Sequence, residues 1–228
     1  MLTLLFIRHA ESVGNQQHRM QGHADYELSE QGWKQAECLA QRLTVEFCVP
    51  TCVYSSPIRR AKQTAQVILQ HLPSQVSLAY DDRLKECDQG IFEGLTWLEA
   101  SKLYPELCNK LETTMEWIPV PEAETPSEVR HRVHSWLKDI FTNHQGGHSL
   151  WIVAHQWLLC NLISALLGSD RTWQMPIDHT GIFEFSVDLD RWTHLDVETF
   201  SNSNLWQIHR FNDVQHLPSS PLSLSSQM

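Results

Sequence analysis

Three short, mainly apolar runs constrain the fold of this chain more than any other feature. They span residues 2–7, 51–55 and 149–154. Runs of this length without regular polar alternation are typical of strands that are buried on both faces of a parallel sheet. Segments with helical spacing of apolar residues separate them, the longest at about 126–144. The sequence therefore predicts buried strands that alternate with helices.

The predicted fold class is α/β, a three-layer α/β/α sandwich with a mostly parallel central sheet. Further strands are expected at 76–80, 182–187 and about 205–211. A chain of 228 residues holds one substantial α/β domain, which we place at residues 1–216. The Ser/Pro-rich residues 217–228 are expected to form a flexible tail.

Capping and turn residues predict several helix boundaries. Ser29 is the expected N-cap of a helix that runs to about residue 46. Pro57 is expected in the first turn of the next helix, which runs to about residue 72. Gly168 is expected to close a helix that begins at Leu158.

Two segments have no assigned element. The polar residues 10–28 are too long for a simple connection, which predicts a functional loop. Residues 105–121 are a variable region, and it contains Trp117. The segments are of interest because loops carry much of the function in α/β proteins.

The charge balance bounds the possible partners. The net charge is −10 with histidines neutral, and a protein that binds nucleic acid without sequence preference needs a basic face. We therefore expect no nucleic-acid partner. A few clustered arginines can still form a local positive pocket, so a small anionic substrate stays open. The sequence leaves the oligomeric state unknown.

Cysteine usage and the first residues bear on the compartment. Six cysteines are scattered without a CxxC pair, which indicates reduced core residues of a cytoplasmic protein. The chain begins directly on a predicted strand, so we expect neither a signal peptide nor a membrane span.

His131 and His134 have a spacing that could bind a metal, as do His144 and His148, but no third ligand converges with either pair. We expect no metal and no cofactor.

Basic residues follow the predicted strands at three separate places. Arg8 and His9 end the first run, Arg59 and Arg60 follow the second, and His155 follows the third. Because the carboxyl ends of parallel strands meet at one edge of a sheet, these groups should converge. Arg8 and His9 alone could equally be a solvated polar strand end. Arginines and imidazoles gathered at one point match the oxygens of a phosphoryl group.

Phosphoryl transfer to histidine needs two further features. A neutral imidazole can attack phosphorus in line while its other nitrogen donates to a backbone carbonyl. The leaving oxygen then needs a proton from a carboxyl group. Glu86, in the loop after the predicted strand at 76–80, is the best candidate for this acid. The nearby alternatives are Asp81, Asp82, Asp88 and Glu93.

These segments resemble the histidine phosphatase superfamily, the phosphoglycerate-mutase-like fold. Residues 5–12, LFIRHAES, are similar to its signature. Four further segments in the same order are similar to family motifs: DYELSEQGWKQA at 25–36, SSPIRRAKQTA at 55–65, LKECDQGIFEG at 84–94 and VAH at 153–155. A late segment at 212–217 is similar as well. The resemblance covers nearly the whole chain to about residue 217 and indicates the phosphatase branch that needs no cofactor.

The resemblance implies a role for each matched residue. His9 is the implied nucleophile, which becomes a phosphohistidine. Glu86 is the implied acid and then the base for water. Arg8, Arg60 and His155 would clamp the phosphate.

Three more residues are placed by the same resemblance. Asn15 and Gln21 would add hydrogen-bond donors to the phosphate or the leaving group. The motif at 55–65 aligns the catalytic arginine with Arg60, so we expect Arg59 at the rim of the site.

The chain departs from the family pattern at two positions. Ala10 follows His9 where glycine is commonest, and the added methyl group should cost little. Gln156 follows His155 where glycine is usual. That His-Gln pair resembles the fructose-2,6-bisphosphatase branch, and the amide could bind a sugar hydroxyl. A helix-start glutamine that points to solvent explains the residue equally well.

The leading hypothesis is a metal-independent phosphomonoesterase that hydrolyses a small phosphorylated metabolite. A phosphoglycerate mutase and a sugar bisphosphatase are alternatives with the same machinery, and an inactive binding module is an alternative of another class. In the family, mutases rely on a longer lid insertion after the acid. Only about 30 residues, 95–125, stand here as the expected substrate-capping insertion, which favours hydrolysis. The substrate itself stays open.

Overall fold

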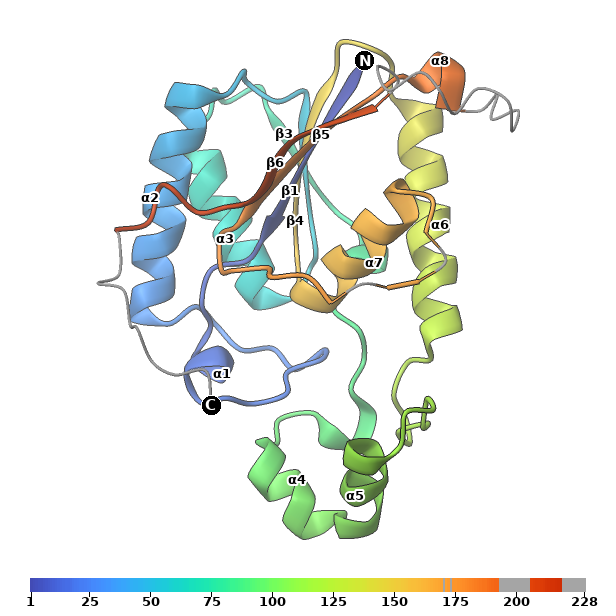
Figure 1. Ribbon diagram of the computed structural model, residues 1–228. Helices are drawn as coiled ribbons and strands as arrows, with labels where there is room; N and C mark the ends of the chain where they lie inside the picture. The colour runs from blue at the N-terminus through green and yellow to red at the C-terminus, as the bar shows by residue number, and fades with distance from the viewer. Residues whose placement is uncertain (170, 173, 193–205, 219–228) are drawn as a thin grey trace.

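The computed structural model describes residues 1–169, 171–172, 174–192 and 206–218. Within these residues, six strands form one sheet in the order β3-β2-β4-β1-β5-β6 (Figure 1). The strands are β1 (Leu2–Arg8), β2 (Cys52–Ser55), β3 (Ser77–Tyr80), β4 (Ser149–Ala154), β5 (Ile182–Val187) and β6 (Trp206–Asp213). The predicted tail lies mostly outside the described residues.

Helices cover both faces of the sheet, with α2 and α3 on one side and α6 and α7 on the other (Figure 1). The helices are α1 (Val13–Gln16), α2 (Glu30–Glu46), α3 (Arg59–Gln70), α4 (Trp97–Leu103), α5 (Pro105–Thr113), α6 (Pro126–Asn143), α7 (Gln156–Leu166) and α8 (Leu189–Trp192). Two 3₁₀ turns, at Asp82–Leu84 and Gly90–Phe92, lie between β3 and α4. This confirms the predicted three-layer sandwich.

The sheet is mostly parallel, as predicted. β1 pairs with β4, β4 with β2 and β2 with β3, all in parallel, while β5 runs antiparallel to both β1 and β6. The carboxyl ends of β1, β2 and β4 therefore lie at one edge of the sheet. The residues that follow them come from distant parts of the sequence.

Burial on both faces explains the apolar runs. Leu4 and Phe6 of β1 face the core under α6 and α7, whereas Leu5 and Ile7 face the core under α2 and α3. All four are fully buried. Because successive strand residues point to opposite faces, a strand between two helical layers needs apolar residues at every position.

Two of the three predicted helix boundaries are confirmed. The Ser29 side chain accepts a hydrogen bond from the Gly32 N–H, and Gly168 follows α7 with φ of +66°. Pro57 was expected inside the first turn of α3, but that helix begins at Arg59 with Ile58 as its N-cap. The cause is tertiary, because the Asp25 carboxylate from the 10–28 loop accepts the Arg59 N–H at 2.8 Å.

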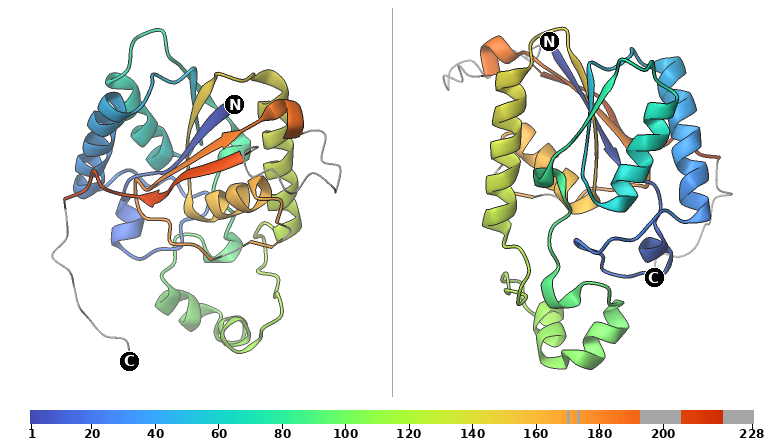
Figure 2. Two further views of the ribbon diagram at one scale, coloured as in Figure 1. Left: turned by 45° about the horizontal axis from the view of Figure 1, so that its top comes forward. Right: turned by 180° about the vertical axis from the view of Figure 1, so that it is seen from behind.

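Residues 95–125 form a small lobe at the end of the molecule where α4 and α5 lie (Figure 2). Thr96 caps α4 through a capping box with Glu99, and Pro105 occupies the first turn of α5. The sequence analysis assigned no element to α5. The role of the lobe as a substrate cap stays a prediction. None of the described helices is both long and apolar enough to cross a membrane.

A glycine of α2 allows the loop after β1 to pack. A Cβ built at Gly32 would lie 1.9 Å from the Glu11 carbonyl oxygen, which is a backbone atom that cannot move aside alone. The Gly32→Ala variant should therefore lower the free energy of unfolding by about 2 kcal/mol or more, measured by urea denaturation. Lys34→Ala, at an exposed position of the same helix, is the control and should change little. Equal midpoints for the two variants would contradict this packing.

Candidate active site

Two histidines lie side by side at the carboxyl ends of β1 and β4. The ladder pairs Arg8 with Ala154, and the His9 N–H donates to the Ala154 carbonyl at 2.9 Å. The rings of His9 and His155 have centroids 5.0 Å apart at 60°. Both residues are buried, at 2% and 0% exposure. The convergence expected from the parallel sheet is present here.

The hydrogen bonds of His9 fix its tautomer. Its Nδ1 lies 2.7 Å from the Ala10 carbonyl oxygen, which can only accept, so Nδ1 carries the proton. Its Nε2 therefore keeps a lone pair, which accepts from Arg60 Nε at 3.2 Å. Burial, together with the charge of Arg60, holds the pKa of His9 well below 6.5. His9 is a neutral imidazole at neutral pH.

Arg60 lies in the site, and Arg59 lies outside it. Arg60 is 1% exposed and donates to the carbonyl oxygens of Gly22 and Ala24, both at 2.8 Å. Burial lowers its pKa to about 10, so the guanidinium stays charged at neutral pH. Arg59 forms a half-exposed ion pair with Glu27 at 2.9 Å.

Arg8 and His155 each keep a buried nitrogen without a hydrogen-bond partner among the described residues. Arg8 donates from Nη1 to the Ile177 carbonyl at 2.6 Å, and its Nε is unpaired. His155 Nε2 lies 2.8 Å from Ser56 Oγ, which leaves Nδ1 unpaired. Burial, together with the charge of Arg60, holds the pKa of His155 well below 6.5. Buried polar groups without partners are uncommon outside functional sites.

The amides of Asn15 and Gln21 are turned toward the site by Ser12. The Ser12 N–H donates to Asn15 Oδ1 at 3.1 Å, and the Ser12 hydroxyl lies 2.7 Å from both Asn15 Oδ1 and Gln21 Oε1. With the oxygens held in this way, the NH₂ groups are the free donors. A Cβ at Gly14 would lie 2.7 Å from Gln21 Cδ, so a larger residue there would displace the Gln21 amide.

Glu86 reaches the site from the loop after β3. Its carboxylate accepts N–H groups from Cys87 at 3.0 Å, Leu158 at 3.0 Å and Trp157 at 3.3 Å. Two of these donors belong to the first turn of α7, so the helix that follows His155 also holds the carboxylate. Glu86 is 8% exposed.

These side chains line one small cavity of about 210 Å³. It contains most of the residues expected in the site: Arg8, His9, Asn15, Gln21, Arg60, Glu86 and Gln156. His155 is not among the residues that line this cavity, although its ring lies beside that of His9. Gln156 has no side-chain hydrogen bond among the described residues, and its role stays open between a substrate contact and a solvated amide. Arg19 and Gln89, which the sequence analysis did not single out, also line the cavity.

Arg132 on α6, which was not expected in the site, clamps the backbone of the Glu86 loop. Its guanidinium donates to the carbonyl oxygens of Arg83 at 2.7 Å, Lys85 at 2.8 Å and Glu86 at 3.1 Å. It also forms a two-point pair with Glu124, at 2.5 and 2.7 Å. A signal was present, because Arg132 stands beside the apolar stripe of α6, where a charged side chain needs a buried partner.

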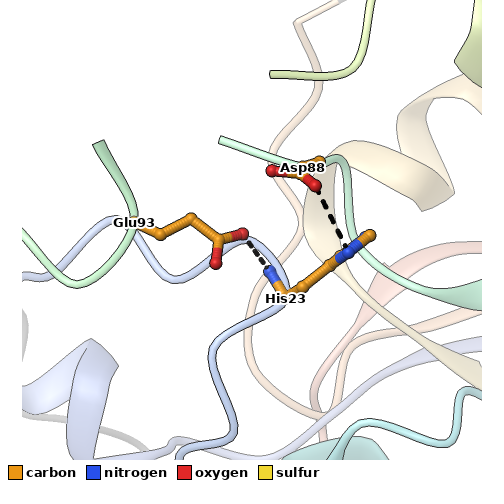
Figure 3. A group of neighbouring side chains, drawn as sticks. All are labelled: His23, Asp88 and Glu93. Atoms are coloured by element: carbon orange, nitrogen blue, oxygen red, sulfur yellow. Dashed lines mark hydrogen bonds and ion pairs between the residues drawn. The ribbon is translucent and has the colours of Figure 1, made fainter. Parts of the chain in front are cut away.

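A second set of contacts holds the Glu86 loop, and Figure 3 shows its residues, His23, Asp88 and Glu93. The His23 N–H donates to Glu93 at 2.5 Å, and His23 Nδ1 lies 3.5 Å from Asp88. His23 Nε2 lies 2.9 Å from the Glu86 carbonyl oxygen. The three residues could offer ligand atoms within 4.8 Å of one another. In the structure they join the 10–28 loop to the Glu86 loop by direct contacts.

A third imidazole, that of His179, lies near His9, and no sequence motif pointed to it. The ring centroids of His9 and His179 are 6.1 Å apart, and His179 Nε2 is buried without a partner among the described residues. Burial, with a contribution from Arg8, lowers the pKa of His179 to about 3.

Trp97 lies outside the cavity and packs against Phe92, and its indole N–H donates to Glu112.

The chain is similar to known phosphatases along most of its length. The sequence profile of the histidine phosphatase superfamily (branch 1) matches residues 4–199. Phosphoserine phosphatase 1 of Hydrogenobacter thermophilus is 32% identical over 181 residues, which cover 78% of this chain and 83% of that protein. Phosphoglycerate mutase-like protein 4 of Arabidopsis thaliana is 27% identical over 215 residues, which cover 94% and 86%.

A solved structure shares the arrangement. The phosphoserine phosphatase of Entamoeba histolytica, in complex with 3-phosphoglyceric acid, superposes with a TM-score of 0.73 at 25% identity. The match covers 96% of this chain and 100% of that chain. The fold is therefore shared with this solved phosphatase.

The buried histidines predict a loss of stability in mild acid. His9, His155 and His179 have folded pKa values below 6.5, so the unfolded chain binds protons that the folded chain excludes. The free energy of unfolding should therefore fall as the pH drops from 7 to 5, measured from urea midpoints at each pH. His179→Asn removes one of these groups and should show a smaller fall. Midpoints that do not change with pH would contradict the neutral state of these rings.

Proposed function

The chain belongs to the histidine phosphatase superfamily and is a phosphoric monoester hydrolase, and from this premise we propose that it hydrolyses a small phosphorylated metabolite through a phosphohistidine on His9. The observation that carries the proposal is the state of His9. Its protonated Nδ1 is held by a carbonyl, and its Nε2 lone pair faces Arg60 inside the small cavity.

The phosphate has a matching set of donors. The guanidinium groups of Arg8 and Arg60, His155 Nδ1 and the amides of Asn15 and Gln21 would hold its oxygens. The Arg60 Nε that now contacts His9 would turn to a phosphate oxygen, which frees the lone pair. These donors supply the charge stabilisation themselves, and the proposal therefore requires no metal and no cofactor.

The reaction proceeds in two displacements. His9 Nε2 attacks phosphorus, the bond from phosphorus to the ester oxygen breaks, and Glu86 gives its proton to the departing alcohol. The Glu86 carboxylate then takes a proton from water, whose oxygen attacks phosphorus. The bond from phosphorus to nitrogen breaks, inorganic phosphate leaves, and His9 and Glu86 return to their starting states.

A mutase would use the same residues but return the phosphoryl group to an acceptor, so it must exclude water from the phosphohistidine. The short lobe formed by α4 and α5 favours hydrolysis. The mutase alternative predicts isomerisation of 3-phosphoglycerate primed by 2,3-bisphosphoglycerate, and the bisphosphatase alternative predicts release of phosphate from fructose 2,6-bisphosphate. A cytoplasmic location also stays a prediction.

The proposal is tested by detecting the covalent phosphohistidine on His9. Wild-type protein mixed with ³²P-labelled phosphoserine or p-nitrophenyl phosphate should show a burst of product and an acid-labile, alkali-stable label on His9, with steady turnover that persists in EDTA. His9→Ala should lose the label and at least about 10³-fold of the rate. His144→Ala, a histidine remote from the cavity, is the control. Turnover by His9→Ala at the wild-type rate would overturn the proposal.

Arg132 is a positioning residue in this mechanism, because it fixes the backbone that carries Glu86. Arg132→Ala should lower kcat about tenfold to a hundredfold with a smaller change in KM, since a misplaced acid slows protonation of the alcohol. Arg132→Lys should recover part of the loss. The control is Lys138→Ala, at an exposed position of the same helix, which should keep wild-type kinetics. The rate is scaled to the concentration of folded protein, measured from the circular dichroism signal of each variant. An unchanged kcat per site would show that Arg132 serves stability alone.

A further inference from the structure

A second and larger cavity adjoins the phosphate cavity. Its volume is about 720 Å³, within the range of ~300–1,000 Å³ that is typical of ligand pockets, whereas the phosphate cavity of about 210 Å³ falls below that range. The two cavities share Gln89 and Trp157 in their walls. The phosphate cavity therefore opens beside a space large enough for a bulky group.

The general acid stands at the boundary of the two cavities. Glu86 lines the phosphate cavity, and the next residue, Cys87, lines the larger one. In the proposed reaction Glu86 must reach the ester oxygen, which joins phosphorus to the alcohol. With phosphorus beside His9, the alcohol therefore lies beyond Glu86, on the side of the larger cavity.

The walls of the larger cavity are rich in exposed apolar side chains. Trp117 and Trp157 line it and are 58% and 50% exposed. Leu111, Ile118, Val120 and Val129 complete its apolar wall. Indole rings exposed together in a hollow are unusual for core packing, and planar apolar groups stack on them favourably.

The charges of the wall do not favour a second phosphate. Arg130 and Arg171 line the cavity together with Asp88 and Glu116, so the two signs balance. Glu124 is neutralised by Arg132. The positive groups Arg8 and Arg60 are instead gathered around His9, where the proposed function places the phosphate of the ester.

We propose that the larger cavity binds the alcohol portion of the substrate, and that the enzyme prefers phosphomonoesters of planar apolar alcohols. This inference rests on the proposed function and names its substrate class. An aromatic or similarly flat leaving group lies between Trp117 and the Glu86 loop, while its phosphate reaches His9. A small polar ester such as phosphoserine leaves the indole wall unused.

The experiment compares esters that differ in the size of the alcohol but little in its acidity. The two pairs are phenyl with 2-naphthyl phosphate, and ethyl with 2-phenylethyl phosphate. In each pair the larger ester should have a kcat/KM at least about tenfold higher, mainly through a lower KM, because it buries additional aromatic surface. Trp117→Ala should bring both ratios near one. Trp33→Ala, an exposed indole on α2, is the matched control and should leave both ratios as in the wild type.

A binding measurement keeps the test informative if Trp117→Ala is poorly folded. In the wild-type protein, 2-naphthylmethylphosphonate should bind at least about tenfold more tightly than methylphosphonate and should change the tryptophan fluorescence.

The outcomes separate the two proposals. Ratios near one in a wild-type enzyme that still forms phosphohistidine would overturn the inference and leave the proposed function intact. High ratios that persist in a folded Trp117→Ala variant would also overturn it, because the preference would come from elsewhere. No phosphate release from any ester, with no label on His9, would overturn the proposed function itself.

Discussion

The hydrogen bond from the His9 N–H to the Ala154 carbonyl, at 2.9 Å, continues the pairing of β1 and β4 past the end of β1. The site depends on this register. It places the two residues that follow adjacent parallel strands side by side, so that the His9 and His155 rings lie 5.0 Å apart. A register shift of one residue would turn these two side chains to opposite faces of the sheet.

Burial of this edge sets the chemistry. Arg8 and Arg60 remain charged although they are buried, and their field together with desolvation keeps His9 neutral. An acidic protein thus concentrates positive potential at one point, where a phosphate can bind. Glu86 reaches the site from another element, the loop after β3. Glu86 is held by the first turn of α7 and by Arg132 of α6, whereas His9 follows β1, so separate layers of the sandwich position these two side chains.

Much of this arrangement was predictable. Continuous apolar runs specified buried strands, and a parallel sheet then required that Arg8, Arg60 and His155 meet at one edge. Motif spacing separated Arg60 from Arg59, and the structure puts one in the cavity and the other in a surface ion pair. The start of α3 was misplaced because Asp25, whose carboxylate accepts the Arg59 N–H, is distant in sequence. Arg132 was missed because its partners are backbone carbonyls of another segment, and no local pattern specifies those.

The sequence by itself determined the α/β sandwich, its family and the residue types of the phosphate site, because periodicity, caps and motif spacing are local properties of the chain. Only the tertiary structure decided which group meets the lone pair of His9, what clamps the Glu86 loop and where the larger cavity lies. Each of these involves segments far apart in sequence: Arg60 donates to His9, Arg132 donates to the Glu86 loop, and Trp117 and Trp157 line the larger cavity from separate segments. Such contacts depend on how the layers pack, and packing geometry is not encoded in any single segment.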